Sequence, residues 1–256
     1  MRNLLGLLTA ALVLVPSPLG AQENRAWPER AFVTIDVPFQ PLNNDFSESL
    51  SFADTLRKNE NVTFVAGYDT TRGPAIDVGA GVRLGNRFGA GVTTSWFRRS
   101  GSGSFDLKLP NPLVANKPLD LTDTVSGLKR QELGIHVQAL YAVSLGKKAR
   151  VLAAGGPSVF QVTQDLVRSV EFDTLPGFTS LNFNQALIAQ VRKTAVGFNV
   201  GADITWTLAS HFGVGTVTRY SRASLTLDPG AASGVIRAIE MHAGGLHIGG
   251  GIRVLF

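Results

Sequence analysis

The chain has 256 residues, of which 44% are hydrophobic and 17% are charged, with 28 Gly and no Cys. This composition excludes a disulfide scaffold, a thiol nucleophile, Cys-ligated zinc and a lipid-anchored N-terminal Cys, and it argues against a coiled coil or a disordered chain. The formal net charge is +5, but the basic residues are scattered singles and pairs, so the sequence predicts no nucleic-acid partner.

The first segment has the features of a secretory signal. Arg2 precedes an apolar run over residues 4–15, and small residues end the segment at Ala21. Because the run is too short to cross about 30 Å of hydrocarbon as a helix, we interpret it as a cleaved export signal. The sequence thus divides into a signal peptide (1–21), a polar periplasmic lead-in (22–30) and a single domain (31–256).

Eight later segments alternate between apolar residues and polar or small ones, which is the pattern of β-strands with two unlike faces. In the last of them, Ile252 and Val254 share one face, whereas Arg253 shares the other with Gly251. The predicted strands are 31–40, 73–84, 87–99, 131–145, 149–163, 194–208, 211–225 and 239–256.

The register of the segment 149–163 is ambiguous, because its Gly155-Gly156-Pro157 suggests a bulge or kink. Elsewhere the connections alternate sharply in length, which is typical of an up-and-down outer-membrane barrel. The tight turns are Gly85-Asn86, Gly146-Lys147-Lys148 and Ala209-Ser210, and the long connections, predicted to be polar and irregular, are 41–72, 100–130, 164–193 and 226–238. Within the first of these, residues 61–68 are a candidate extension of the second strand.

The charged residues decide which face of the sheet points inward. Strands can span hydrocarbon only as a closed barrel, with the apolar face toward lipid, whereas a soluble barrel inverts the two faces. Here the charges share a face with most of the Gly, which suits the cramped interior of eight strands. We therefore predict an all-β fold, an eight-stranded antiparallel up-and-down transmembrane β-barrel. Its predicted lumen charge network is Asp36, Asp77, Arg83, Glu132, His136, Asp203, Arg219, His247 and Arg253, with Arg99 as a further candidate.

Aromatic residues on the apolar face support this placement, because two aromatic girdles are expected at the two membrane interfaces. The alternative is that they are ordinary core aromatics. The predicted girdle residues are Phe88, Tyr141, Trp206 and Phe212 near the tight turns, and Trp96 and Tyr220 near the long loops.

The signal, the eight alternating strands and the final Gly-Gly-Gly-Ile-Arg-Val-Leu-Phe resemble small bacterial outer-membrane β-barrel proteins of the OmpA/OmpX-like kind. The resemblance implies location in the bacterial outer membrane after export. It also implies that Phe256 is part of the signal recognised by the barrel assembly machinery. No functional motif of a particular member is carried over, so the resemblance implies no activity.

Acidic and basic groups in so narrow a lumen should pair with one another, which predicts a plugged barrel; a narrow polar solute channel is the alternative. A lipid A-modifying enzyme is a less favoured alternative. Its candidate residues are Glu240 and His242 on one face near the outer rim, with Ser221 or Ser224 on the neighbouring strand. The sequence predicts no catalytic residue, metal or cofactor.

Basic residues stand at the feet of the long loops, where Arg and Lys could bind lipopolysaccharide phosphates or remain solvated rim charges. They are Arg98, Arg99, Lys129, Arg130, Arg168, Arg192 and Lys193. The favoured function is a non-enzymatic outer-membrane protein with a structural, envelope-integrity or surface-interaction role through its loops. Its predicted partners are outer-membrane lipids, lipopolysaccharide and the barrel assembly machinery, and the sequence identifies no loop ligand.

Overall fold

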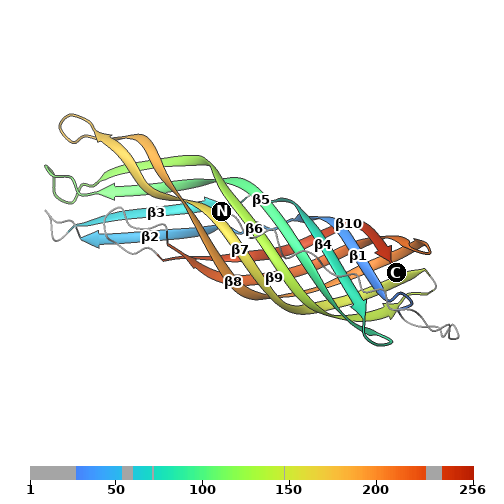
Figure 1. Cartoon of the computed structure of the whole chain (residues 1–256). Coiled ribbons are helices and arrows are strands. Elements are labelled where there is room, and N and C mark those ends of the chain that lie inside the picture. The colour runs from blue at the N-terminus through green and yellow to red at the C-terminus, as the bar shows by residue number, and fades with distance from the viewer. Residues whose placement is uncertain (1–26, 54–59, 71, 147, 229–237) are drawn as a thin grey trace, which may run out of the picture.

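The computed structural model describes residues 27–53, 60–70, 72–146, 148–228 and 238–256, so the predicted signal peptide lies outside the described residues. Among these residues, no helix is long and apolar enough to cross a membrane. Eight antiparallel strands form a closed ring, because β1 pairs with β10 and β5 pairs with β6 (Figure 1). In ring order they are β1 (Ala31–Gln40), β4 (Gly73–Arg83), β5 (Phe88–Leu109), β6 (Leu119–Ser144), β7 (Ala149–Thr174), β8 (Leu181–Ala209), β9 (Phe212–Leu227) and β10 (Ile239–Leu255). The predicted eight-stranded antiparallel up-and-down barrel is confirmed.

The two ends of the barrel differ. At one end, called here the tight-turn end, short turns join β4 to β5, β6 to β7 and β8 to β9. The backbone of Phe256 closes the ring there: its N–H donates to Ala31 O (2.9 Å), and its carbonyl accepts from Arg30 N (2.6 Å). At the opposite, long-strand end, β5 to β8 project well beyond β1 and β4 (Figure 1).

Near the tight-turn end, the barrel is apolar outside and polar or small inside. On β9, Phe212 and Val214 are exposed, whereas Gly213 and Gly215 are buried against the lumen. The predicted girdle residues all lie on the exterior face, with Phe88, Trp96, Trp206 and Phe212 between 42% and 64% exposed. The rings of Phe88 and Tyr141 pack with centroids 5.2 Å apart, and those of Phe198 and Tyr220 with centroids 6.1 Å apart.

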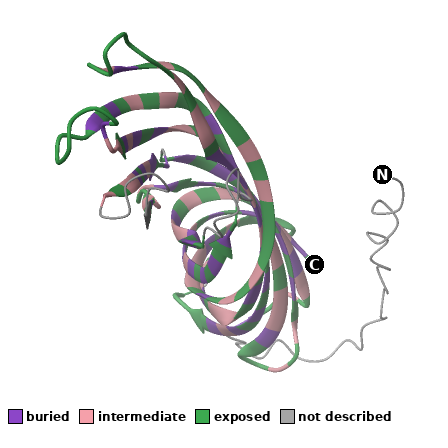
Figure 2. Ribbon diagram, turned by 90° about the vertical axis from the view of Figure 1, so that its left-hand side faces the viewer, coloured by how far each residue is buried: buried purple, intermediate pink, exposed green. Residues whose placement is uncertain are grey.

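The same strands change character toward the long-strand end. Beyond Tyr220 on β9, Arg222 and Ser224 are exposed while Ala223 and Leu225 are buried, so the apolar residues have moved to the inside. The strands continue as bands of alternating burial into this region (Figure 2). A hydrophobic core fills the space they enclose; it includes Phe64, Phe105, Leu107, Leu121, Leu166, Leu225, Ile239 and Met241.

Three of the long connections are therefore not irregular, and that prediction was wrong for most of 41–72, 100–130 and 164–193. The first forms the hairpin of β2 (Phe46–Ala53) and β3 (Asn61–Asp69), and the other two extend β5, β6, β7 and β8. β3 pairs with the distal half of β5 on the same edge as β4, with Asp69 opposite Ser102 and Ala75 opposite Phe97. Residues 61–69 therefore continue the line of β4 after a short break, and the predicted extension of the second strand is confirmed. An alternation with its apolar side inward is as good a strand signal outside a membrane as the reverse is within one.

The segment Gly155-Gly156-Pro157 contains no bulge, so that part of the prediction was wrong, but its pairing with β6 is interrupted at Gly156 and Pro157. The β6–β7 pairing has the same register at His136–Ser158 and at Ala139–Gly155, on either side of this segment. A Cβ on Gly156 would collide with Val137 O, so glycine is required by close approach of the neighbouring strand.

Candidate functional site

The lumen at the tight-turn end is closed by an aromatic plug. Trp27, just before β1, is fully buried at the tight-turn end of the lumen and packs on Phe32, with ring centroids 5.9 Å apart. The guanidinium of Arg150 lies 5.4 Å from the Trp27 ring centroid and forms an ion pair with Glu29. Arg83 Nη1 donates to the carbonyl oxygens of Trp27 and Pro28, at 2.5 and 3.2 Å. Leu140, Ala142, Leu152 and Leu255 complete this apolar layer.

Glycines make room for these rings. A Cβ added at Gly89 would strike the Trp27 ring and lie 2.5 Å from Val82 O, and one added at Gly81 would lie 2.5 Å from the Phe32 ring. The sequence predicts small inward residues because the barrel is narrow, and here Gly89 and Gly81 leave space for the rings of Trp27 and Phe32. The last residues of the lead-in predicted for 22–30 belong to this plug. The polar composition of that segment gave no indication that Trp27 is buried.

Above the plug, one arginine binds two carboxylates. Arg253 Nη1 donates to Asp36 Oδ1 (2.7 Å), and Nη2 forms an ion pair with Asp203 Oδ2. Asp203 also accepts a hydrogen bond from Thr205 Oγ1 (2.7 Å). The guanidinium side chain is only 1% exposed, so the two carboxylates neutralise a charge that would otherwise be costly to bury.

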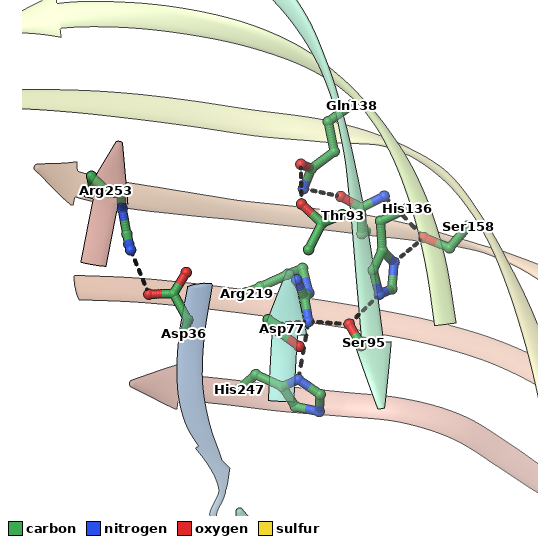
Figure 3. Close-up of polar contacts among 11 residues, drawn as sticks. Asp36, Asp77, Thr93, Ser95, His136, Gln138, Ser158, Arg219, His247 and Arg253 are labelled. Carbon is green, nitrogen blue, oxygen red and sulfur yellow. Dashed lines mark hydrogen bonds and ion pairs between the residues drawn. The ribbon is translucent and has the colours of Figure 1, made fainter. Parts of the chain in front are cut away.

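A second buried cluster lies deeper in the lumen and is centred on Arg219 (Figure 3). Arg219 Nη2 donates to Asp77 Oδ2 (2.7 Å) and Ser95 Oγ (2.6 Å), and it lies 3.1 Å from His247 Nδ1. Ser95 Oγ lies 2.9 Å from His136 Nε2, whose Nδ1 is 2.8 Å from Ser158 Oγ. The cluster thus joins side chains from β4, β5, β6, β7, β9 and β10 across the barrel.

Amide side chains extend this cluster. Gln138 Nε2 donates to Asn199 Oδ1 (2.9 Å), and Asn199 Nδ2 donates to Ser158 Oγ (2.9 Å). Thr93 Oγ1 donates to Gln138 Oε1 (3.2 Å). Between this cluster and the plug lies a cavity of about 50 Å³, bordered by Asp36 among others. Such a volume holds only a few water molecules.

A third polar layer lies toward the long-strand end. Arg130 Nε donates to Glu132 Oε1 (2.6 Å), and Arg130 Nη2 donates to His242 O (2.6 Å). Glu132 Oε2 accepts from Gly244 N (2.8 Å). The pairing of β10 with β1 ends at Ile248, before this height. The third layer therefore connects the part of β10 that β1 does not pair with to β6, across the lumen.

The predicted lumen residues therefore occupy several separate layers rather than one network. Asp36, Asp203 and Arg253 form one group; Asp77, His136, Arg219 and His247 form another; Glu132 belongs to the third layer; and Arg83 lies beside the plug. Sequence reasoning missed Ser95, Ser158 and Asn199, although their inward position in the alternation was a usable signal. Among the described residues, no group of three or more His, Cys, Asp or Glu could hold a metal ion.

The paired basic residues at the rim divide between the two faces. Arg98 is exposed, whereas Arg99 turns back to donate to Pro74 O (3.0 Å). Lys129 is exposed, whereas Arg130 is 2% exposed and faces the lumen. Adjacent residues of a strand point to opposite sides, so in these two pairs only Arg98 and Lys129 can meet a ligand outside the barrel. Arg168, Arg192 and Lys193 are all exposed.

His242 and Ser224 face outward, and the geometry argues against an activated serine. Ser224 Oγ lies 3.2 Å from His242 Nδ1, and Arg222 Nη2 lies 2.8 Å from His242 Nε2. Since a guanidinium only donates, Nε2 accepts, and in the neutral ring the proton is on Nδ1, where it is donated to Ser224. The histidine therefore cannot take the serine proton. The other candidate, Ser221, is buried in the lumen.

Comparisons with known proteins find similar solved structures only. No family model matches the chain, and no curated protein does. Among solved structures, it is similar to the outer membrane protein OprG from Pseudomonas aeruginosa, with 10% identity over 91% of this chain and 99% of that chain, and a TM-score of 0.49. It is similar to Neisserial surface protein A, with 11% identity over 88% and 97% of the two chains and a TM-score of 0.38. It is also similar to the outer membrane protease OmpT from Escherichia coli, with 6% identity over 88% and 97% and a TM-score of 0.42. The strand topology described above, rather than these likenesses, establishes the fold.

Proposed function

We propose that this protein is a closed barrel of the bacterial outer membrane, with a non-enzymatic structural or surface-interaction role carried by the β-structure that it holds outside the membrane. The exterior apolar belt supports the membrane placement. On β9 its outward residues run from Phe212 to Tyr220. At about 3.3 Å per residue and a tilt of about 40°, such a run rises roughly 20 Å, close to the ~25 Å apolar band of outer-membrane barrels.

The observation that carries the proposal is closure of the lumen at successive heights. Trp27 closes the tight-turn end, the Arg253 and Arg219 clusters cross the middle, and the hydrophobic core fills the long-strand end. The space between them, about 50 Å³, admits water but no larger solute. Eight strands leave an interior just wide enough for side chains, in contrast to the aqueous channels of porins.

The hydrophobic core at the long-strand end favours a rigid external structure over mobile loops. Phe105 packs against Phe64 and Phe183 with ring centroids 6.2 and 5.4 Å apart. Tyr68 Oη donates to Glu48 Oε1 (2.7 Å) and accepts from Val167 N (3.1 Å), which links the β2–β3 hairpin to β7. A partner would therefore meet a preformed surface, which lowers the entropic cost of binding.

Conductance tests the closed lumen. Purified protein reconstituted into planar bilayers should give no stable conductance steps, with a 16-stranded porin as the positive control. Reproducible steps that scale with protein concentration would overturn the proposal in favour of a narrow channel.

Epitope tags test the membrane placement. A tag inserted after Val114, between β5 and β6, should be labelled by antibody on intact cells. A matched tag after Gly146, in the tight turn between β6 and β7, should be labelled only after the outer membrane is permeabilised. The reverse pattern, or labelling of neither tag in membrane fractions, would contradict the proposed placement.

A further inference from the structure

A shallow groove of about 250 Å³ lies on the outer wall of the barrel, where β5 to β8 leave the apolar belt. Its border nearer the belt is formed by Trp96 and Leu133, which are 51% and 39% exposed. Its border on the long-strand side is polar. The polar side chains there belong to Gln131, Gln161, Thr163 and Arg192.

The register between strands arranges the outward residues in two rows. Nearer the tight-turn end, Trp96 opposes Leu133, which opposes Gln161. Two residues farther along, the row across β5, β6, β7 and β8 consists of Arg98, Gln131, Thr163 and Arg192. Since neighbouring strands lie about 4.8 Å apart, the two arginines are separated by roughly 14 Å of backbone, with an amide and a hydroxyl between them.

Both arginines are available to an anion. Within the described part of the chain, no carboxylate forms an ion pair with Arg98 or Arg192. The carboxylate in the next row is Asp165, whose oxygens accept hydrogen bonds from Lys129 N (3.0 Å) and Gln190 Nε2 (3.1 Å). The carboxylate that lines the groove, Glu132, turns inward to Arg130. Arg192 lines the groove, and Arg98 flanks it on the neighbouring strand, opposite the lining residue Gln131. Two unneutralised cations thus border neutral polar groups and an apolar lower edge.

We propose that this groove binds the phosphorylated sugar headgroup of lipopolysaccharide, an inference that rests on the membrane placement proposed above. Guanidinium groups match phosphate oxygens in a bidentate geometry, so Arg98 and Arg192 each bind one end of a disaccharide phosphorylated at both ends. Gln131, Gln161 and Thr163 meet its hydroxyl groups. The acyl chains pass over Trp96 and Leu133, at the depth where tryptophan prefers to lie.

The span between the two arginines suits a ligand with two phosphates, because each guanidinium can then bind a phosphate of its own, whereas a glycerophospholipid offers only one. The choice of residues also provides a matched control. Arg222 on β9 stands two residues beyond Tyr220, as Arg98 stands two residues beyond Trp96, and it is likewise exposed, but it lies on another strand, outside the row that joins Arg98 to Arg192.

The test is a titration of the micelle-embedded full chain with bisphosphorylated lipid A, with bound lipid counted by native mass spectrometry. The double variant R98Q/R192Q should bind at least about ten-fold more weakly than the wild type, whereas R222Q should bind like the wild type. Removal of one lipid phosphate should weaken binding to the wild type and leave the double variant unchanged. Equal affinity of the wild type and the double variant, or equal weakening by R222Q, overturns the groove.

Two further readouts separate the possible failures. Phosphatidylglycerol is titrated in parallel, and binding as tight as that of lipid A overturns the assignment to lipopolysaccharide. Insertion into phospholipid vesicles is scored for every variant. Failure of the wild type to insert overturns the proposed function itself, whereas normal insertion with unchanged lipid A affinity in the double variant overturns only the groove.

Discussion

Asp36 and Asp77 lie directly opposite each other on β1 and β4, and both side chains face the lumen. Two like charges in such a cross-strand position repel each other. Each carboxylate is bound to a different arginine, Asp36 to Arg253 and Asp77 to Arg219, at 2.7 Å in both cases. The two arginines come from β10, the other neighbour of β1, and from β9, which follows it in the ring, so the repulsion between β1 and β4 is balanced by the next two strands of the sheet.

We expect R219Q to be the most destabilising single change in this group. It leaves the buried Asp77 carboxylate beside Asp36 with no cation of its own, and breaking a buried pair typically costs about 3–5 kcal/mol. D77N should lower the free energy of unfolding by less than R219Q. It leaves Arg219 without its carboxylate, but it also removes the repulsion between Asp77 and Asp36. The measurement is the free energy of unfolding in urea of vesicle-embedded protein.

The double variant R219Q/D77N is the control for this prediction. It removes both charges, so it should be more stable than R219Q alone, and the coupling between the two sites should be about 1 kcal/mol or more. A double variant as unstable as the sum of the single changes would mean that the pair is not coupled.

The three tryptophans should report their positions by fluorescence. Trp96 and Trp206 are exposed on the exterior, whereas Trp27 is fully buried in the plug. Lipids brominated on their acyl chains quench only rings that touch them, so a resistant fraction of the emission should remain in the wild type. That fraction should disappear in W27F and become the whole signal in W96F/W206F. Quenching of Trp27 would place it outside the lumen.

Two glycines near the tight-turn end should respond differently to alanine. A Cβ on Gly89 meets the Trp27 ring and the carbonyl of Val82, whereas a Cβ on Gly85 has nothing within 4 Å. We expect G89A to destabilise by about 1–3 kcal/mol through overpacking. G85A should be neutral or stabilising by up to about 1 kcal/mol, because it restricts the unfolded chain. Equal urea midpoints for the two variants would contradict the packing described for the plug.

The link between the β2–β3 hairpin and β7 depends on one hydroxyl. Y68F removes the donor to Glu48 and the acceptor for Val167 N, and an unsatisfied buried polar group costs about 1–3 kcal/mol. Hydrogen exchange at the Val167 amide should accelerate about 5- to 100-fold, while exchange in the membrane-facing strands stays unchanged. Y220F, an outward-facing tyrosine on β9, is the control and should leave Val167 protected.

The enzymatic alternative predicts a different outcome for His242. Because its geometry with Ser224 and Arg222 leaves the serine unactivated, H242A should not change the acylation pattern of lipid A in cells that express the protein. Mass spectrometry of extracted lipid A is the measurement, with S224A as a parallel variant. A shift of one acyl chain that is present in the wild type and lost in H242A would restore the enzymatic interpretation.

The sequence was most informative where strands meet the apolar belt. Alternation alone located all eight ring strands and assigned Asp77, Arg219 and Arg253 to the interior, because one face of each strand must satisfy lipid. It could not pair these charges. Asp77 and Arg219 are on strands separated in the sheet by β1 and β10, and their meeting depends on the shear of the closed barrel, which no local period encodes.

The long-strand end was mispredicted for a related reason. Leu119 and Leu121 have the same parity on β6 as the outward-facing Leu133, but they face inward. The register between β5 and β6 shifts at Gly101/Ser102, where Gly127 is an extra residue of β6, and a single alternation along the strand does not reveal this change of phase. Trp27 was missed because it precedes the first periodic segment, and only the three-dimensional closure of the plug reveals its burial. Both errors come from features that a single alternation pattern does not describe.

The height at which the outward residues of each strand change from apolar to charged marks the border of the membrane in the sequence itself. On β5 it falls between Trp96 and Arg98, and on β9 between Tyr220 and Arg222. Several strands change character at the same height. Displacing the barrel by two residues along the membrane normal would therefore bury charged side chains in hydrocarbon at one border and expose apolar side chains to water at the other. The immersion depth is thus fixed by the polypeptide itself, before any particular lipid makes contact with it.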